Sequence, residues 1–224
     1  MKGFFVTGTD TSVGKTELSA ILARHFREKG LKVGVMKAIA TGVKGPCRDA
    51  IILKKAAGSK MSIDDIAPIR FKAPLAPLVA ARLEKKDVDL GRLWKKFRAI
   101  ASFNDIVIVE GIGGLMVPIK KQKKNRIIYT IDLIKKMRLP VILVARPGLG
   151  TINHTLMSIK ILRFNRLKIA GVVFNYTRPV IKDISARTNP FIIKELSGVK
   201  VLGIVAYNKK RENRRIRWLD TLDF

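Results

Sequence analysis

The fold is decided by the N-terminal stretch Gly3-Phe4-Phe5-Val6-Thr7-Gly8-Thr9-Asp10-Thr11-Ser12-Val13-Gly14-Lys15-Thr16. Residues 3–7 form an apolar run typical of a buried strand, and residues 17–28 follow a helical pattern. A glycine-containing loop between a strand and a helix can hold a phosphate on its backbone N–H groups. Lys15 would reach the terminal phosphates and the Thr16 hydroxyl would ligate Mg²⁺. The stretch therefore predicts binding of ATP or GTP.

This loop is a variant of the Walker A loop. The usual pattern places four residues between its two glycines, whereas five residues separate Gly8 from Gly14 here. The tripeptide Gly-Lys-Thr also begins helices that bind no nucleotide. The strand before it and the helix after it favour the nucleotide site.

Composition is typical of one globular domain, which we expect to span residues 1–224. The chain has 224 residues, of which 47% are hydrophobic, so it can bury a sizeable core. Cys47 is the only cysteine and cannot form an internal disulfide, and His25 and His154 are its only potential histidine partners in a zinc site. No apolar run approaches the roughly 18 residues of a membrane span. We predict a cytoplasmic protein without a membrane partner.

The charge is strongly positive, with 45 Lys and Arg against 17 Asp and Glu, a net +28. Such a balance is common in proteins that bind nucleic acids or anionic surfaces. The basic residues are spread along almost every predicted helix, with local excesses in the loop 120–126 and the tail 209–217. We interpret them as solvated surface, with nonspecific polyanion binding as a side effect and no specific nucleic-acid site.

Short apolar runs alternate with amphipathic segments along the chain. Strands are predicted at 3–7, 32–36, 106–109, 141–145, 169–174 and 201–205. Helices are predicted at 17–28, 49–57, 77–83, 90–101, 128–137, 152–165 and 190–196. This alternation predicts an α/β fold of the P-loop NTPase type, with a mostly parallel sheet flanked by helices. Ligands of such sheets bind beyond the carboxyl ends of the strands.

Three charged residues stand where that chemistry is expected. Lys37 ends the second predicted strand, which lies beside the first if strand order follows sequence, and its ammonium could neutralise a transferring phosphoryl group. Glu110 ends a buried strand and needs a cationic partner, either a metal or a lysine. Asp49 begins a helix. The alternatives are a solvated lysine, a structural ion pair and a helix cap.

Two further segments follow strands. Gly148-Leu149-Gly150-Thr151-Ile152-Asn153 opens a helix whose free N–H groups could hold a substrate carboxylate, although a plain helix start is the alternative. We interpret His154 as structural. Asn175 could recognise an adenine edge through its amide, or it could be a turn residue.

These residues resemble those of the dethiobiotin synthetases, the ATP-dependent carboxylases of biotin synthesis. The resemblance rests on Phe5 to Thr11 with Val13-Gly14-Lys15-Thr16, on Lys37 with Thr41-Gly42, on Asp49-Ala50, on Val109-Glu110-Gly111 with Gly113-Gly114, on residues 140–144, on Ile152-Asn153-His154 and on Asn175. Only the N-terminal signature is specific, but the other matches occur in the right order.

The resemblance implies carboxylation of one amine of diaminopelargonic acid by CO₂ or bicarbonate. ATP then phosphorylates the carbamate, and the second amine closes a cyclic urea. It implies roles for Lys15, Lys37, Thr11 and Thr41 around the reacting groups, and Mg²⁺ on Thr16, Asp49 and Glu110. It also implies a homodimer in which the loop of Gly148, Leu149, Gly150, Thr151, Ile152 and Asn153 binds the partner's substrate carboxylate. ATP contacts are expected at Ser12, Val13, Gly14, Lys15, Thr16, Glu17, Asp49, Glu110, Gly111, Ile112, Gly113, Asn175, Tyr176, Ala206, Tyr207 and Asn208.

The chain departs from the family pattern at several positions. Ala38 and Ala206 stand where proline is common, Thr41 where serine is common, and Ser12 where an acid is often found. The basic loop 120–126 and the basic tail are further departures.

Two other classes of protein fit parts of the sequence. A partition or septum-positioning ATPase would use the positive charge to hold DNA or a membrane, but its signature lysine would fall near position 10, where this chain has Asp10. An amidotransferase of the cobyrinic-acid type would need a glutaminase domain with a nucleophilic cysteine, and none follows.

Overall fold

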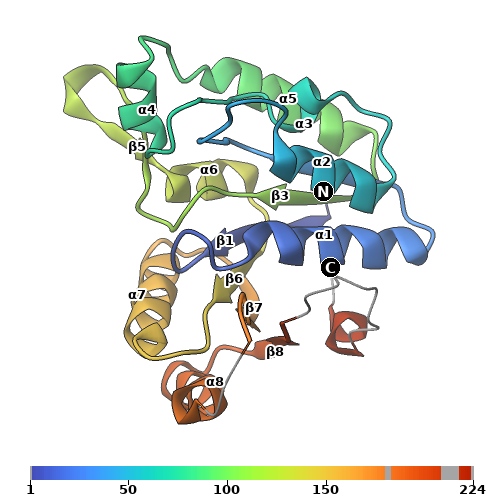
Figure 1. Ribbon diagram of the computed structural model, residues 1–224, viewed down its shortest axis with the longest axis vertical. Coiled ribbons are helices and arrows are strands. Elements are labelled where there is room, and N and C mark those ends of the chain that lie inside the picture. The colour runs from blue at the N-terminus through green and yellow to red at the C-terminus, as the bar shows by residue number, and fades with distance from the viewer. Residues whose placement is uncertain (1, 180–182, 208–216, 223–224) are drawn as a thin grey trace.

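The N-terminal stretch folds into a strand, a loop and a helix, as predicted. In the computed structural model, which describes residues 2–179, 183–207 and 217–222, strand β1 spans Gly3–Gly8 and helix α1 spans Lys15–Glu28. The whole of β1 is buried, because other strands flank it on both sides. Figure 1 shows β1 and α1 near the middle of the molecule.

A six-stranded sheet forms the centre of the fold, in the order β2-β3-β1-β6-β7-β8. All of its neighbouring strands run parallel, which confirms the predicted fold class. The other five strands are β2 (Val33–Lys37), β3 (Ile106–Glu110), β6 (Val141–Ala145), β7 (Ile169–Asn175) and β8 (Val201–Val205).

The expectation that the second strand lies beside the first is wrong. β3 lies between β1 and β2, because the chain crosses two strand positions through α1 and returns to fill the gap. This places Glu110 opposite Lys37 in the register of β2 and β3. Strand order reverses at β1, between β3 and β6, which is where open α/β sheets form a crevice for ligands.

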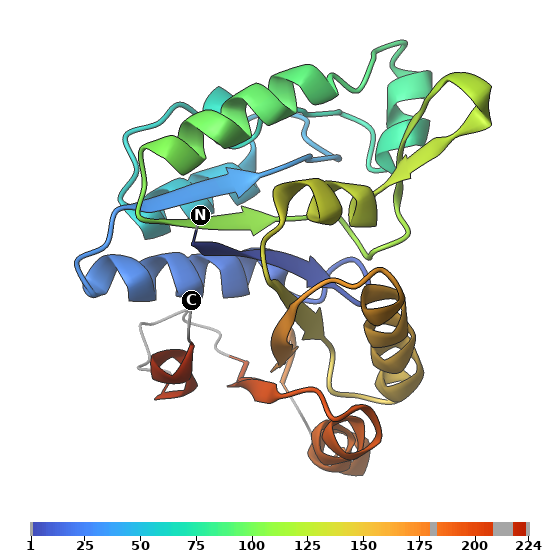
Figure 2. The same cartoon turned by 180° about the vertical axis from the view of Figure 1, so that it is seen from behind.

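Helices cover both faces of the sheet, as the two opposite views in Figures 1 and 2 show. On one face α1 and α2 (Arg48–Ala57) bury Leu18, Leu22 and Leu53 against alternate sheet residues such as Val6. The other face carries α5 (Leu90–Ser102), α6 (Thr130–Met137), α7 (Thr151–Phe164) and α8 (Ile184–Ser197). The short helices α3 (Ile63–Ile66) and α4 (Pro77–Leu83) lie in the connection from α2 to α5.

Two predicted helix starts are wrong. Ile128 belongs to strand β5 (Ile127–Tyr129), which pairs antiparallel with β4 (Pro118–Lys121) in a separate two-stranded hairpin around the short 3₁₀ helix η1 (Lys123–Asn125). The basic loop 120–126 is thus mostly hairpin. The last helix begins at Ile184, before the predicted residue 190, because Asp183 caps it by accepting hydrogen bonds from two backbone N–H groups.

The 3₁₀ helix η2 (Arg217–Thr221) packs against strand β8. The Trp218 ring lies so close to Gly203 that a Cβ there would meet it at 2.1 Å, and Leu219 joins the core under α1. Most of the predicted basic tail, residues 209–216, lies outside the described residues. No helix within the described part of the chain is long and apolar enough to cross a membrane.

Candidate active site

The phosphate loop connects β1 to α1 through an unusual backbone. Gly14 has φ of 92°, and a Cβ there would meet the Asn175 amide nitrogen at 1.7 Å, so no other residue fits without a shift. Ser12 also has positive φ, at 55°, a conformation that non-glycine residues seldom adopt. Asn175 donates from Nδ2 to the Val13 carbonyl over 3.1 Å. The loop is therefore held from the end of β7 as well as from its own strand and helix.

Lys15 is buried inside this loop. Its Nζ donates to the Asp10 carbonyl over 2.7 Å. Burial and the nearby Lys37 ammonium lower the pKa of Lys15 to about 8. An anion in the loop would reverse this shift, because it favours the charged form of the lysine.

A second lysine lies at the centre of a polar cluster. Lys37 Nζ lies 2.5 Å from Glu110 Oε1 and 2.9 Å from Asp49 Oδ2. The Thr16 hydroxyl donates to the same Glu110 oxygen over 2.8 Å. The cluster joins the ends of β2 and β3 to the starts of α1 and α2, which is where the sequence placed it.

The cluster carries one positive and two negative charges, and its lysine and glutamate are buried. Lys37 and Glu110 are 5% and 1% exposed. Burial opposes the positive charge of Lys37, but Glu110 and Asp49 outweigh it and raise the pKa of this lysine. Lys37 therefore stays charged at neutral pH.

The residues predicted for Mg²⁺ are brought together, and they suit a magnesium site. Glu110 Oε2 is buried without a hydrogen-bond partner among the described residues. The Oε1 atom of the same carboxylate contacts the Thr16 hydroxyl and Lys37, which also pairs with Asp49. Within the described residues, no group of three or more His, Cys, Asp or Glu gathers to hold a metal. A hydroxyl, two carboxylates and phosphate oxygens match the way Mg²⁺ is bound together with a nucleotide.

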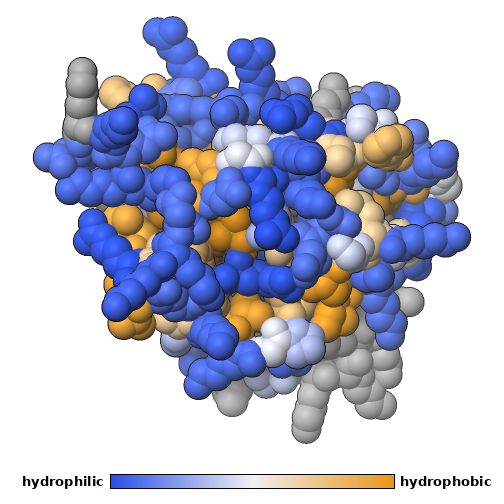
Figure 3. All heavy atoms as spheres, turned by 90° about the horizontal axis from the view of Figure 1, so that it is seen from above, coloured by the Kyte–Doolittle hydropathy of each residue, from blue (hydrophilic) through white to orange (hydrophobic). Residues whose placement is uncertain are grey.

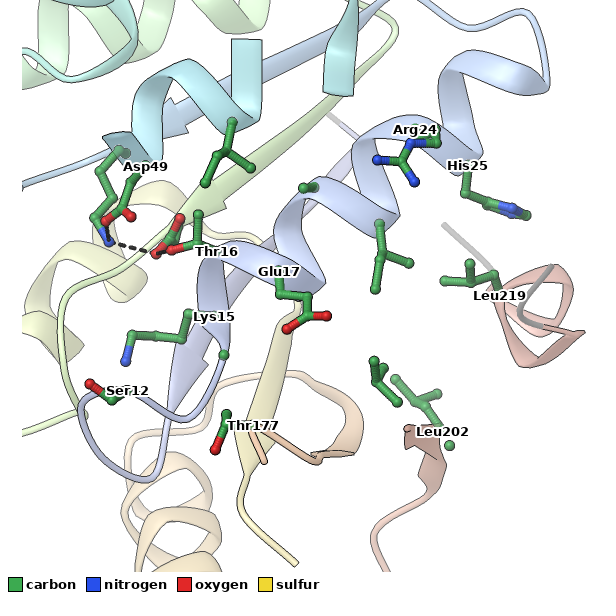
Figure 4. A pocket seen from close by; sticks show the side chains of 18 of the residues that line it. Ser12, Lys15, Thr16, Glu17, Arg24, His25, Asp49, Thr177, Leu202 and Leu219 are labelled. Carbon is green, nitrogen blue, oxygen red and sulfur yellow. Dashed lines mark hydrogen bonds and ion pairs between the residues drawn. The ribbon is translucent and has the colours of Figure 1, made fainter. Parts of the chain in front are cut away.

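A cavity of about 1490 Å³ opens over this cluster. Figure 4 shows Asp49 and Thr16 together at one end, Glu17 farther along α1, and Leu202 and Leu219 at the far end. The predicted residues that line this cavity are Thr11, Ser12, Gly14, Lys15, Thr16, Glu17, Lys37, Thr41, Asp49, Glu110, Ile112, Gly113, Ala206 and Tyr207. Val13 is fully buried beneath the loop, and Gly111 packs close to Phe5. Asn208 lies outside the described residues.

The predicted carboxylate loop lies at a second cavity of about 550 Å³. Gly148, Leu149 and Thr151 line it, together with Asn175 and Tyr176. Gly150 is the N-cap of α7, while Ile152 packs into the core of that layer and Asn153 is exposed. Neither the loop nor the helix start lines the cavity that holds Lys37. Within one chain the loop 148–153 therefore does not line the larger cavity, although Thr177 lines both cavities.

Asn175, which is predicted to contact adenine, is almost completely buried. It is 1% exposed, and its amide nitrogen is engaged by Val13. Its carbonyl oxygen Oδ1 is buried without a partner among the described residues. A ligand donor could still satisfy that oxygen.

Sequence reasoning missed several residues that line the cavities. Arg48 and Thr177 line the larger cavity, and Arg146 lines the smaller one. Arg146 directly follows β6, and the sequence indicated residues 146–154 as a strand-end segment for ligands without assigning Arg146 a role. No local sequence pattern indicated that Trp218 would line the larger cavity, because its position depends on its contact with Gly203 of strand β8.

Some of the positive charge is neutralised by ion pairs at the surface. Figure 3 shows hydrophilic side chains over most of the face seen from above, with apolar patches between them. Among the described lysines, Lys120 is paired with Asp87 at 2.5 Å and Lys86 with Glu84 at 2.8 Å.

Comparison with known proteins identifies the family. The chain matches the model of the AAA domain family over residues 2–215. It is 45% identical over 212 residues to the ATP-dependent dethiobiotin synthetase of Thermodesulfovibrio yellowstonii, covering 92% of this chain and 88% of that one. The chain belongs to the dethiobiotin synthetase family. The synthetase of Bacillus subtilis is 41% identical, over 91% of this chain and 87% of its own. The chain is accordingly an ATP-dependent ligase of this family.

Solved structures with the same fold are more distant. The septum site-determining protein of Pyrococcus horikoshii, complexed with Mg-ADP, aligns with a TM-score of 0.53 and 17% identity, over 92% of this chain and 82% of that one. A plasmid partition protein of Borrelia burgdorferi bound to AMPPNP gives a TM-score of 0.58 and 12% identity, over 98% and 93%. At these identities the likeness shows a common P-loop fold only. Family membership of this chain rests on the dethiobiotin synthetases.

Proposed function

We propose that this protein converts diaminopelargonic acid, CO₂ and ATP into dethiobiotin, ADP and phosphate. The observation that carries this proposal is the position of Lys37, held between Glu110 and Asp49 in the cavity that the phosphate loop lines. A charged lysine beyond the terminal-phosphate position suits a reaction in which a phosphoryl group moves onto a carbamate.

Three chemical steps make up the proposed reaction. One amine of the substrate attacks CO₂ and loses a proton, which gives a carbamate. A carbamate oxygen then attacks the γ-phosphorus of ATP, forming a carbamic-phosphoric anhydride and releasing ADP. The second amine attacks the carbonyl carbon, phosphate leaves, and the cyclic urea closes.

The residues of the cluster act by position and charge. Lys15 and the loop N–H groups hold the β- and γ-phosphates, while Lys37 neutralises the oxygens of the transferring group. The Thr11 and Thr41 side chains line the space where the carbamate would lie. No covalent enzyme intermediate is required, so orientation and electrostatic stabilisation supply the rate enhancement.

Thr16, Asp49 and Glu110 would hold Mg²⁺. These residues would place the ion beside the phosphates, where it would supply positive charge that offsets theirs. The Thr16 hydroxyl and the free Oε2 of Glu110 support this assignment. Lys37 shares the other Glu110 oxygen, so the carboxylate orients the lysine and would serve the metal with its second atom.

The remaining site residues are proposed to bind the adenine of ATP and the carboxylate of the other substrate. We propose that adenine lies between the residues that follow β7 and β8, near Asn175, Thr177, Ala206 and Tyr207. The loop 148–153 lies at a separate cavity, so we propose that it binds a substrate carboxylate presented by the second subunit of a homodimer. The protein is proposed to work in the cytoplasm as one domain.

The dependence of ATP hydrolysis on the other substrates tests this function. ADP release should require both diaminopelargonic acid and bicarbonate, since the phosphoryl acceptor forms from the two together. A Lys15→Ala variant should abolish it. ADP release that ignores both substrates and responds to DNA would overturn the proposal in favour of a partition-type ATPase.

A further inference from the structure

An ion pair joins the phosphate loop to the loop that follows β6. Arg146 Nη2 lies 3.3 Å from Asp10 Oδ2. Asp10 belongs to the β1–α1 loop and Arg146 to the β6–α7 loop, which are 136 residues apart in sequence. The two loops meet because β1 and β6 are neighbouring strands of the sheet.

Asp10 organises the first half of the phosphate loop through three of its atoms. Its Oδ1 accepts the Thr11 N–H over 2.7 Å, and its carbonyl accepts Lys15 Nζ over 2.7 Å. Its Oδ2 is the atom that Arg146 binds. The direction of the Lys15 side chain and that of the Thr11 amide therefore both depend on where Asp10 is held.

Arg146 is the group that holds Asp10 from outside the loop. The Asp10 side chain contacts Thr11 and Arg146, and Thr11 is its own chain neighbour. A guanidinium offers directional donors that a lysine would not. The loop needs such support because Ser12, two residues after Asp10, has a positive φ of 55°. A strained backbone of that kind persists only when the surrounding structure fixes it.

We propose that Arg146 is a positioning residue for nucleotide binding, which sets the phosphate loop through Asp10. It does not touch the reacting atoms. Because Arg146 also lines the cavity of the loop 148–153, the pair links the nucleotide loop to the segment proposed to bind the substrate carboxylate. The inference rests on the proposed binding of ATP by this loop, and it does not require that dethiobiotin is the product.

The test measures the dissociation constant of a non-hydrolysable ATP analogue by titration calorimetry, for Arg146→Ala, Asp10→Asn and the double variant. Arg92→Ala serves as the control, since it removes an equal charge from the exposed surface of α5. Both side chains of the pair are about half exposed, at 51% and 48%, so the effect should be modest. We expect Arg146→Ala to weaken binding about three- to fivefold relative to the control.

Three further readouts separate positioning from a structural role. Thermal unfolding should not differ between Arg146→Ala and Arg92→Ala, because half-exposed pairs add little stability. The double variant should bind no more weakly than Asp10→Asn alone. The difference from wild type should shrink at high salt, since salt screens the pair.

The opposite results overturn the inference. These are affinity for the analogue equal to that of Arg92→Ala, or effects of the two single variants that add fully in the double variant. A wild-type protein that binds no nucleotide also overturns it. Because these measurements need no turnover, failure of the proposed synthetase reaction would show separately, as normal nucleotide binding without product.

Discussion

Lys37 Nζ lies 2.5 Å from Glu110 Oε1, and the two residues face each other across neighbouring parallel strands. This pair places a charged lysine in the cavity of the phosphate loop, and the other carboxylate oxygen has no partner among the residues that the structure describes. On the basis of this relationship we propose that the lysine acts in phosphoryl transfer and that the second carboxylate oxygen binds Mg²⁺.

Replacement of Lys37 separates chemistry from binding. Lys37→Ala should lower turnover by about 10²- to 10³-fold, because the transferring group loses its cation. Nucleotide binding should remain measurable by calorimetry. The change also leaves the Glu110 carboxylate buried without its lysine, which should destabilise the fold by about 3–5 kcal/mol.

A paired replacement controls for that loss of stability. Lys37→Met with Glu110→Gln removes both charges and should recover most of the unfolding free energy in a denaturant titration. Turnover should stay low. Activity restored along with stability would exclude Lys37 from the mechanism.

Replacement of Glu110 tests metal ligation. Glu110→Gln should raise the Mg²⁺ concentration needed for half-maximal activity by at least about tenfold, since it removes a charged ligand atom. Asp87→Asn is the matched control, because Asp87 pairs with Lys120 on the surface. Identical magnesium titrations for the two variants would rule out direct ligation by Glu110.

The lowered pKa of Lys15 predicts proton uptake on nucleotide binding. In the free protein burial and Lys37 bring this pKa to about 8, so Lys15 is mostly neutral at pH 9. Phosphate oxygens favour the charged lysine, and binding must therefore recruit a proton. Affinity for ATP should fall as pH rises above 8.

Calorimetry at pH 9 in buffers of different ionisation enthalpy measures that proton. The heat of nucleotide binding should vary with the buffer for the wild-type protein. It should not vary for Lys15→Arg, whose guanidinium stays charged. Buffer-independent heats in the wild type would contradict the assignment of Lys15 to the phosphates.

Gly14 provides a steric test of the loop. Gly14→Ala should abolish nucleotide binding, because its Cβ would meet Asn175 Nδ2 at 1.7 Å and its φ is 92°. Gly45→Ala is the control, as a Cβ at Gly45 meets nothing within 4 Å. Equal affinities of the two variants in a binding titration would show that the described loop geometry is not the binding geometry.

The sequence predicted the parallel sheet because buried strands read as continuous apolar runs. It predicted that the polar cluster lies at strand ends because ligands of such sheets bind there. Both rules are local. The position of β3 between β1 and β2 was missed, since strand order depends on packing between distant segments. The pairing of Lys37 with Glu110 follows from that order and could be expected only as a possible partner of a buried acid.

Other features were missed for reasons of their own. The hairpin of β4 and β5 was hidden by its many lysines, which are typical of a solvated loop. The predicted helix began at residue 190, whereas Asp183 caps α8, which begins at Ile184. The Arg146–Asp10 pair joins two loops that only the sheet brings together.

Detection of the product tests the central claim most directly. The purified protein is mixed with diaminopelargonic acid, Mg²⁺, ATP and ¹³C-bicarbonate, and dethiobiotin is measured by mass spectrometry. We predict that the wild-type protein forms dethiobiotin that carries the ¹³C label and that Lys15→Ala forms none. ATP hydrolysis without labelled dethiobiotin would contradict the account.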